Sequence, residues 1–126
     1  YKIKQLMKNM VFKFHYDKEN DILAIYDYSK KVSESVEFSE DIILDLDDNG
    51  RVMGVEIFYA SEFLFAFNKD LDKGFLNDLE NASLEYKEFR NMWFVVLVLK
   101  SGKKVVYQPM PPLKKSEYIS PLIANY

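Results

Sequence analysis

The 126-residue sequence contains no cysteine, one histidine and four glycines. Without cysteine, the chain has no disulfide bond, no thiolate metal site and no cysteine nucleophile. With only four glycines, the chain has no glycine-rich phosphate loop. The chain also has neither a G-x-S-x-G nucleophile motif nor an HExxH zinc motif. These absences exclude several common enzyme classes.

The sequence also lacks a basic excess and a long apolar segment. Its 17 Lys and Arg residues against 20 Asp and Glu residues give a formal net charge of -3 at pH 7, whereas general nucleic-acid binders carry a basic excess. The longest apolar run, MWFVVLVL at residues 92–99, is too short to cross a bilayer. No N-terminal segment has the composition of a signal peptide. We therefore expect a cytoplasmic protein with no membrane segment, and the charge argues against a nucleic-acid partner.

Aromatic residues are abundant, with 10 Phe, 9 Tyr and 1 Trp. Hydrophobic residues make up 48% of the chain and charged residues 29%, which is an ordinary globular balance. So many aromatic side chains can fill a sizeable core. A chain of this length forms one domain, or two small units that share a core.

Alternation of apolar and polar residues predicts strands at residues 11–16, 22–28 and 36–38. Residues 42–58, IILDLDDNGRVMGVEIF, predict a further hairpin. If Asn49 and Gly50 form a two-residue type I′ turn, the apolar residues of both strands fall on one face. The predicted cross-strand pairs are Leu46 with Met53, Leu44 with Val55 and Ile42 with Ile57. A slip of one residue would place the two apolar sets on opposite faces.

The second half of the sequence predicts two short helices followed by three strands. The helices fall at residues 60–67 and 75–81, with Ser61 and Asp72 as their N-caps. The strands fall at residues 83–89, 91–100 and 105–108, and the prolines of PMPP at residues 109–112 should end the ladder. The strand at 91–100 is apolar on both faces, so we expect cover on both sides. In the remaining tail, Leu122 and Ile123 are the residues that would dock against the body.

The predicted fold class is α+β with mostly antiparallel β-structure. It comprises an N-terminal β-hairpin unit, a short helical link and a C-terminal three-stranded meander. The N-terminal unit spans residues 10–67. The helical link, the meander and the tail span residues 68–126, and we expect the two parts to form one compact body.

Residues 14–64 resemble a small family of prokaryotic proteins, the domain of unknown function 2283. The resemblance is carried by FHYDKENDILAIYDY and, after a polar link, by VEFSEDIILDLDDNGRVMGVEIFYASEFL. The shared features, in order, are a tyrosine-aspartate pair, an aliphatic-Tyr strand, a glutamate strand, an Asp-rich hairpin and an Ala-Ser helix start. The resemblance implies no enzymatic activity and no catalytic residue. Some members lie beside small toxin-like proteins, which implies an antitoxin-like role as one version of the function.

The string DLDDNGRVMGVE at residues 45–56 formally matches the calcium loop of an EF-hand. An EF-hand loop lies between two helices, whereas the flanking residues here alternate like strands. We therefore interpret the string as a hairpin. Asp45, Asp47 and Glu56 would share its non-core face, either as metal ligands or as a solvated acidic surface.

His15 is the remaining candidate for acid-base chemistry. It falls on the presumed outward face of the first strand, and its nearest acidic neighbours, Asp17 and Glu19, fall at or in the following turn. A general base needs a partner and a pocket, so we interpret His15 as an exposed strand residue. The sequence assigns no catalytic residue and no cofactor.

The apolar surface predicted for this chain exceeds what two short helices can cover. MWFVVLVL needs cover on both faces, and FLFAF at residues 63–67 is apolar all round. We therefore expect a non-catalytic interaction protein that forms a homo-oligomer or binds a small protein. Packing of the two sheets within a monomer would be the other way to bury these residues. The alternative function is a metal-dependent or carboxylate-based enzyme of unknown substrate, and the third is a nucleic-acid-binding module.

Overall fold

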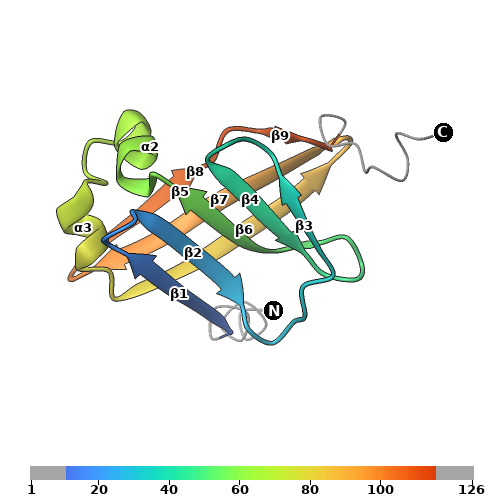
Figure 1. Ribbon diagram of the computed structural model, residues 1–126, viewed down its shortest axis with the longest axis horizontal. Coiled ribbons are helices and arrows are strands. Elements are labelled where there is room, and N and C mark those ends of the chain that lie inside the picture. Colours follow the sequence, from blue (N-terminus) through green and yellow to red (C-terminus); the bar gives the residue numbers. More distant parts are fainter. Residues whose placement is uncertain (1–10, 116–126) are drawn as a thin grey trace.

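Two antiparallel sheets with two short helices at one end make up the fold (Figure 1). This computed structural model describes residues 11–115. Sheet A contains, in spatial order, β1 (Phe12–Asp17), β2 (Ile22–Asp27), β5 (Val52–Phe58), β4 (Ile42–Leu46) and β3 (Glu34–Glu37). Sheet B contains β6 (Asn81–Phe89), β7 (Met92–Ser101) and β8 (Lys104–Pro109), and β9 (Leu113–Lys114) also pairs with β7. The helices α2 (Ala60–Phe67) and α3 (Lys73–Asn77) connect the two sheets.

The predicted α+β class with mostly antiparallel strands is confirmed. The N-terminal hairpins and the C-terminal meander lie where the apolar alternation placed them. No helix among residues 11–115 has the length and apolar character needed to cross a membrane. Leu122 and Ile123 lie outside the described residues.

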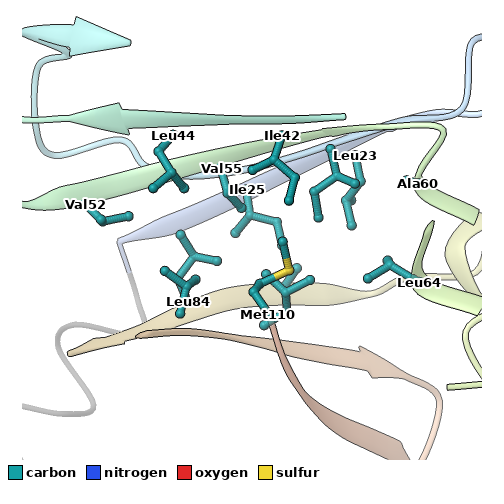
Figure 2. Close-up of a cluster of buried hydrophobic side chains, with 14 of the residues drawn as sticks. Leu23, Ile25, Ile42, Leu44, Val52, Val55, Ala60, Leu64, Leu84 and Met110 are labelled. Atoms are coloured by element: carbon teal, nitrogen blue, oxygen red, sulfur yellow. The ribbon is translucent and has the colours of Figure 1, made fainter. Parts of the chain in front are cut away.

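The core lies between the inner faces of the two sheets. Figure 2 shows side chains of sheet A, such as Leu23 and Leu44, pointing toward Leu84 and Met110 of the other layer. Leu64 of α2 joins the same buried cluster, so the helices close one end of it. Full burial of each such side chain contributes about 1.5–3 kcal/mol. The cluster draws on both halves of the chain, while the division at residues 67 and 68 stays a prediction.

The turn between β4 and β5 is not the predicted type I′ turn. Of its residues only Gly50 has a positive φ, 74°. The Asp47 N–H donates to the Arg51 carbonyl at 2.9 Å, and the Gly50 N–H donates to the Asp47 carbonyl at 3.0 Å. These bonds define a three-residue loop built on a type I turn, followed by a glycine bulge.

A second irregularity follows this turn and changes the hairpin register. Leu46 pairs with Val52 rather than with Met53, which becomes the extra residue of a bulge, while the other two predicted pairs are confirmed. Val52 therefore joins the core, and Met53 lines a groove on the opposite face of sheet A. A longer turn and a compensating bulge thus keep the apolar residues on the inner face.

The start of α2 is held by a residue that the sequence analysis did not single out. The predicted N-cap, Ser61, is wrong, because the helix begins after Tyr59 and no side chain caps it locally. Instead, the Ser61 N–H and hydroxyl donate to the Asp21 carboxylate at 3.0 Å and 2.7 Å. The Tyr16 hydroxyl donates to the same carboxylate at 2.5 Å. Asp21 therefore joins the β1–β2 turn to the helix, while Asp72 caps α3 as predicted, accepting from the Phe75 N–H.

Sheet B departs from the prediction in two places. The prolines end β8 at Pro109, yet pairing with β7 resumes at Leu113, opposite Trp93. Within residues 11–115, the strand β7 is covered on its inner face only, since Phe94 on the outer face is 37% exposed. The described part of the chain therefore does not provide the expected cover on both faces of β7. The prolines create a gap in the ladder because they cannot donate the backbone hydrogen bonds it needs.

Replacing Asp21 should loosen the junction between β1, β2 and α2. Asp21 has a φ of 56°, a conformation that Asp and Asn tolerate better than Ala. We expect Asp21→Ala to reduce the free energy of unfolding by about 2–3 kcal/mol, through lost hydrogen bonds and backbone strain. Asp21→Asn, which keeps an acceptor and the backbone preference, should lose about half as much. Urea denaturation measures both, and an Asp21→Ala protein as stable as the parent would contradict this role.

Candidate functional site

A groove of about 360 Å³ lies on the outer face of sheet A. Its lining combines aromatic and aliphatic side chains with carboxylates and one lysine: Ala24, Ile25, Tyr26, Asp27, Tyr28, Lys30, Val32, Asp45, Met53, Val55 and Glu56. Mixed lining of this kind is typical of small-molecule sites, which occupy about 300–1,000 Å³. The groove is the concave feature nearest to the candidate residues Asp45 and Glu56.

The groove depends on a glycine in the central strand β5. Gly54 lies between Tyr26 of β2 and Asp45 of β4 in the ladder. A Cβ at this position would lie 3.2 Å from the Ile25 carbonyl oxygen and 3.4 Å from Asp45 Oδ2. Asp45 is held from its other side by the Ser35 hydroxyl, which donates to it at 2.7 Å. Glycine thus gives the Asp45 carboxylate the space it occupies.

The three predicted metal candidates do not form one site. Asp45 and Glu56 lie on the outer face of sheet A, whereas Asp47 is 6% exposed and is bound within its own turn. Among residues 11–115, no group of three or more His, Asp or Glu side chains could hold a metal ion. His15 is exposed on β1, as predicted. Asp45 and Glu56 are both half-buried, and both line the groove on the outer face of sheet A.

Asp47 organises the loops at one end of sheet A. Its Oδ1 accepts from the Arg51 and Asn49 N–H groups, each at 2.9 Å. Its Oδ2 pairs with Lys30 Nζ at 3.2 Å. The hydrogen bond from Arg51, with the bond from Asn49 and the Lys30 charge, outweighs burial and lowers the pKa of this carboxyl. In the calcium-loop string Asp47 would be a metal ligand, but here its carboxylate oxygens are used by hydrogen bonds of the turn and by Lys30.

A second concave region, of about 530 Å³, lies beside this turn. It is lined by the loop from Ser29 to Ser33 and by the turn residues Asp47, Asp48, Asn49 and Arg51. Lys30 belongs to both this region and the groove on sheet A. Its lining includes both cations and carboxylates, so it offers no surface of a single charge sign.

A polar cluster lies on sheet B, far from the predicted candidates in sequence. Glu88 accepts hydrogen bonds from the Tyr86 hydroxyl and from Lys115, whose ammonium also lies 5.3 Å from the centre of the Trp93 ring. Burial, with the Glu88 carboxylate, raises the pKa of Tyr86 to about 12. Phe38 packs edge-on against Trp93, at 5.4 Å between ring centres, and so joins the β3–β4 connection to sheet B. Tyr86 and Glu88 lie on one strand, but sequence spacing gave no signal that Trp93 and Lys115 would join them.

The outer face of sheet B carries an apolar surface. We define this face by the outward residues of its strands: Ser83, Glu85, Lys87, Phe89, Met92, Phe94, Val96, Val98, Lys100, Val105, Tyr107, Pro109 and Lys114. Phe89 is 55% exposed and Tyr107 61% exposed. Between them, Val96 and Val98 of the central strand are half-buried by their neighbours. All of the residues named for this surface lie on the strands of sheet B.

Comparisons with known proteins identify the family. Residues 13–61 match the family described as "Protein of unknown function (DUF2283)". The chain is also 37% identical over 97 residues to "Uncharacterized protein MJ0789" of Methanocaldococcus jannaschii, covering 77% of this chain and 82% of that protein. The chain belongs to the DUF2283 family. The resemblance noted at residues 14–64 is thereby confirmed.

A second relative has a functional name. It is "Putative hypoxanthine phosphoribosyltransferase" of Methanosarcina mazei, 34% identical over 64 residues. The match covers 51% of this chain and spans about half of that protein, at 51% of its length. No solved structure matches the chain.

The DUF2283 match corresponds to one structural unit. Residues 13–61 cover most of sheet A and end at Ser61, at the start of α2. Tyr16, Asp21 and Ser61 therefore all lie within the match, and together they join the first hairpin to the helix. The longer match to the M. jannaschii protein exceeds this segment, so family likeness extends beyond sheet A.

Divalent ions should leave the stability of the protein unchanged. Ca²⁺ needs about 6–8 oxygen ligands, and among residues 11–115 no group of three or more acidic or His side chains could hold a metal ion. We therefore expect millimolar Ca²⁺ or Mn²⁺ to leave the melting temperature unaltered in thermal denaturation. A metal-dependent rise that Asp45→Asn abolishes would instead support the metal site that the sequence suggested.

Acid should weaken the fold partly through Asp47. Because the pKa of Asp47 is lowered below its ordinary value of 3.8, its contribution is present above that value and is lost as the pH falls through the folded-state pKa. Asp47→Asn keeps an acceptor for the turn but does not titrate. We expect it to reduce the loss of unfolding free energy between about pH 5 and about pH 2. Asp48→Asn, next in the turn, is the matched control, and identical pH profiles for both variants would contradict this role.

Proposed function

We propose that the protein is a non-catalytic protein-interaction module whose contact surface is the outer face of sheet B. The observation that carries the proposal is the exposure of Phe89, Phe94 and Tyr107 on one sheet face. Contiguous apolar patches of this kind are uncommon on monomers and often mark interaction sites. Aromatic side chains are also enriched at the centres of interfaces.

Two of the edge strands are poorly suited to pairing with another chain, which favours contact through a sheet face. The edge strand β8 ends at prolines, which cannot extend a ladder, and the edge strand β3 of sheet A is four residues long with two glutamates. Short, charged or proline-ended edges discourage pairing with another chain. Phe94, Val96 and Val98, on the outer face of sheet B, are neither charged residues nor prolines. In an antitoxin-like version of this role, a small protein would occupy the same face.

The alternative enzymatic function has less support. The name of the M. mazei relative points to chemistry on a phosphoribosyl substrate, which needs a phosphate-binding site. Such sites use glycine-rich loops or helix N-termini, and the four glycines of this chain, Gly50, Gly54, Gly74 and Gly102, form no glycine-rich loop. The N-terminus of α2 already receives the Asp21 carboxylate. We therefore do not extend that activity to this chain.

Nucleic-acid binding would use the same face in another way. Lys87, Lys100 and Lys114 accompany Phe94 and Tyr107, and aromatic residues on a sheet can stack on bases. The surface between the two aromatics is aliphatic, however, and Glu85 lies within it. Aliphatic side chains favour contact with another apolar surface. Nucleic-acid binding would appear as salt-sensitive retention of single-stranded RNA, and we expect none.

A charge at the centre of the face should abolish association. We expect the parent protein to sediment as a species heavier than the 14.9 kDa chain, and Val96→Lys to sediment as a monomer with an unchanged circular dichroism spectrum. Ile43→Lys is the matched control, because Ile43 is a half-buried strand residue on the outer face of sheet A. That variant should associate like the parent. A parent protein that stays monomeric at several hundred micromolar, or Val96→Lys that still associates, would refute the proposal.

A further inference from the structure

We infer that the outer face of sheet B binds a second copy of this chain about a two-fold axis that crosses the strands between the level of Glu85 and the level of Lys87. This inference rests on the proposed function and specifies its partner. It follows from the order of charged and apolar residues along β6 and β7. The opposed surfaces would be the same patch on both chains, as in most two-fold dimers.

The strand register fixes which residues lie side by side on this face. Across β6 and β7, Lys87 pairs with Phe94 and Glu85 pairs with Val96. The next level contains Ser83, Val98 and Tyr107, and the level beyond Phe94 contains Phe89, Met92 and Lys114. The face is thus a set of cross-strand levels about 7 Å apart, since side chains on one face recur every second residue.

Glu85 and Lys87 make the face self-complementary. They lie two residues apart on the same side of β6, both are exposed, and neither belongs to an ion pair formed within residues 11–115. A two-fold axis midway between them places Glu85 of each chain opposite Lys87 of the other. One adjacent pair of opposite charges therefore becomes two ion pairs in the dimer.

An axis along the strands would not achieve this pairing. It would place β6 of one chain over β8 of the other, whose outward residues are Val105, Tyr107 and Pro109. None of these is charged, so Glu85 and Lys87 would be desolvated without partners, which is costly. The charges therefore favour the axis that crosses the strands.

The same axis also pairs the apolar residues. It brings Phe94 opposite Val96 of the second chain and Met92 opposite Val98 of the second chain. Lys114 comes opposite Tyr107 of the second chain, where an ammonium group over an aromatic ring is attractive. The two sheets would then pack face to face with β7 of each chain roughly aligned, the usual geometry for sheet packing.

The size of the face indicates a reversible dimer. Three strands at a spacing of about 4.8 Å, over four levels about 7 Å apart, cover a footprint of roughly 400 Å² before side-chain relief is counted. Stable dimers bury about 800 Å² of accessible surface per partner, so this contact lies at or below that size. We therefore expect dissociation in the micromolar range and a clear response to single charges.

Charge exchange tests the arrangement. Glu85→Lys would place lysine opposite lysine in the homodimer, and Lys87→Glu would place glutamate opposite glutamate. Two repulsive pairs replace two attractive ones by symmetry, so each single variant should raise the dissociation constant about tenfold or more at low salt. An equimolar mixture of the two variants should form a heterodimer with near-parent affinity. The double variant Glu85→Lys/Lys87→Glu should also recover homodimerisation.

The outcomes separate this inference from the proposed function. Glu37→Lys, an exposed glutamate on sheet A, is the control and should leave the dissociation constant unchanged. A monomeric parent protein in analytical ultracentrifugation would refute both the module and its dimer. A parent dimer that Val96→Lys disrupts would support the module. If that dimer is unaffected by the single charge variants, or if the mixture fails to recover association, the two-fold arrangement is wrong.

Discussion

Two packed sheets have four faces, and packing them together buries only two. The two buried faces form the core, because the residues that alternate inward on both sheets make up a single buried cluster. The helix α2 adds Ala60 and Leu64 at one end of that cluster but does not extend over the back of either sheet. The two outer faces therefore differ according to their composition. That of sheet A carries carboxylates and a groove beside Gly54, whereas that of sheet B is apolar at its centre.

Much of the fold could be predicted from the sequence because a period of two residues is a local signal. The pairs Leu44 with Val55 and Ile42 with Ile57 followed from alternation alone. The turn between them could not be predicted this way, because Asn-Gly favours a two-residue loop while the Asp47 side chain stabilises a longer one. The contact that holds the start of α2 could not be predicted for a different reason. Its partner Asp21 lies 40 residues before Ser61, and no local pattern links positions so far apart.

The candidate site was predictable as a set of residues but not as an arrangement. Asp45, Asp47 and Glu56 are all at the hairpin, as expected from the sequence. Period-two alternation placed them on one face, whereas the turn takes Asp47 into its own hydrogen bonds and leaves the other two on the outer face of sheet A. The polar cluster of Glu88 and Lys115 was not predictable at all, because its members are 27 residues apart. Carboxylates therefore act here mainly as acceptors that fix turns and connections.

The pattern of β7 explains why an apolar face and two charges occur together. A strand that is apolar on both sides is ordinary when both sides are buried. Within residues 11–115, however, the buried residues of β7 are Trp93, Val95, Leu97 and Leu99, all on its inner face. A wholly apolar outer face could bind copies of the chain in many orientations, with open aggregation as the result. Opposite charges two residues apart on β6 penalise every orientation that leaves either of them unpaired. Only a two-fold arrangement satisfies both charges with one identical chain, and a two-fold contact closes at two copies. The same two residues would thus supply specificity where the valines and aromatic side chains supply the attraction.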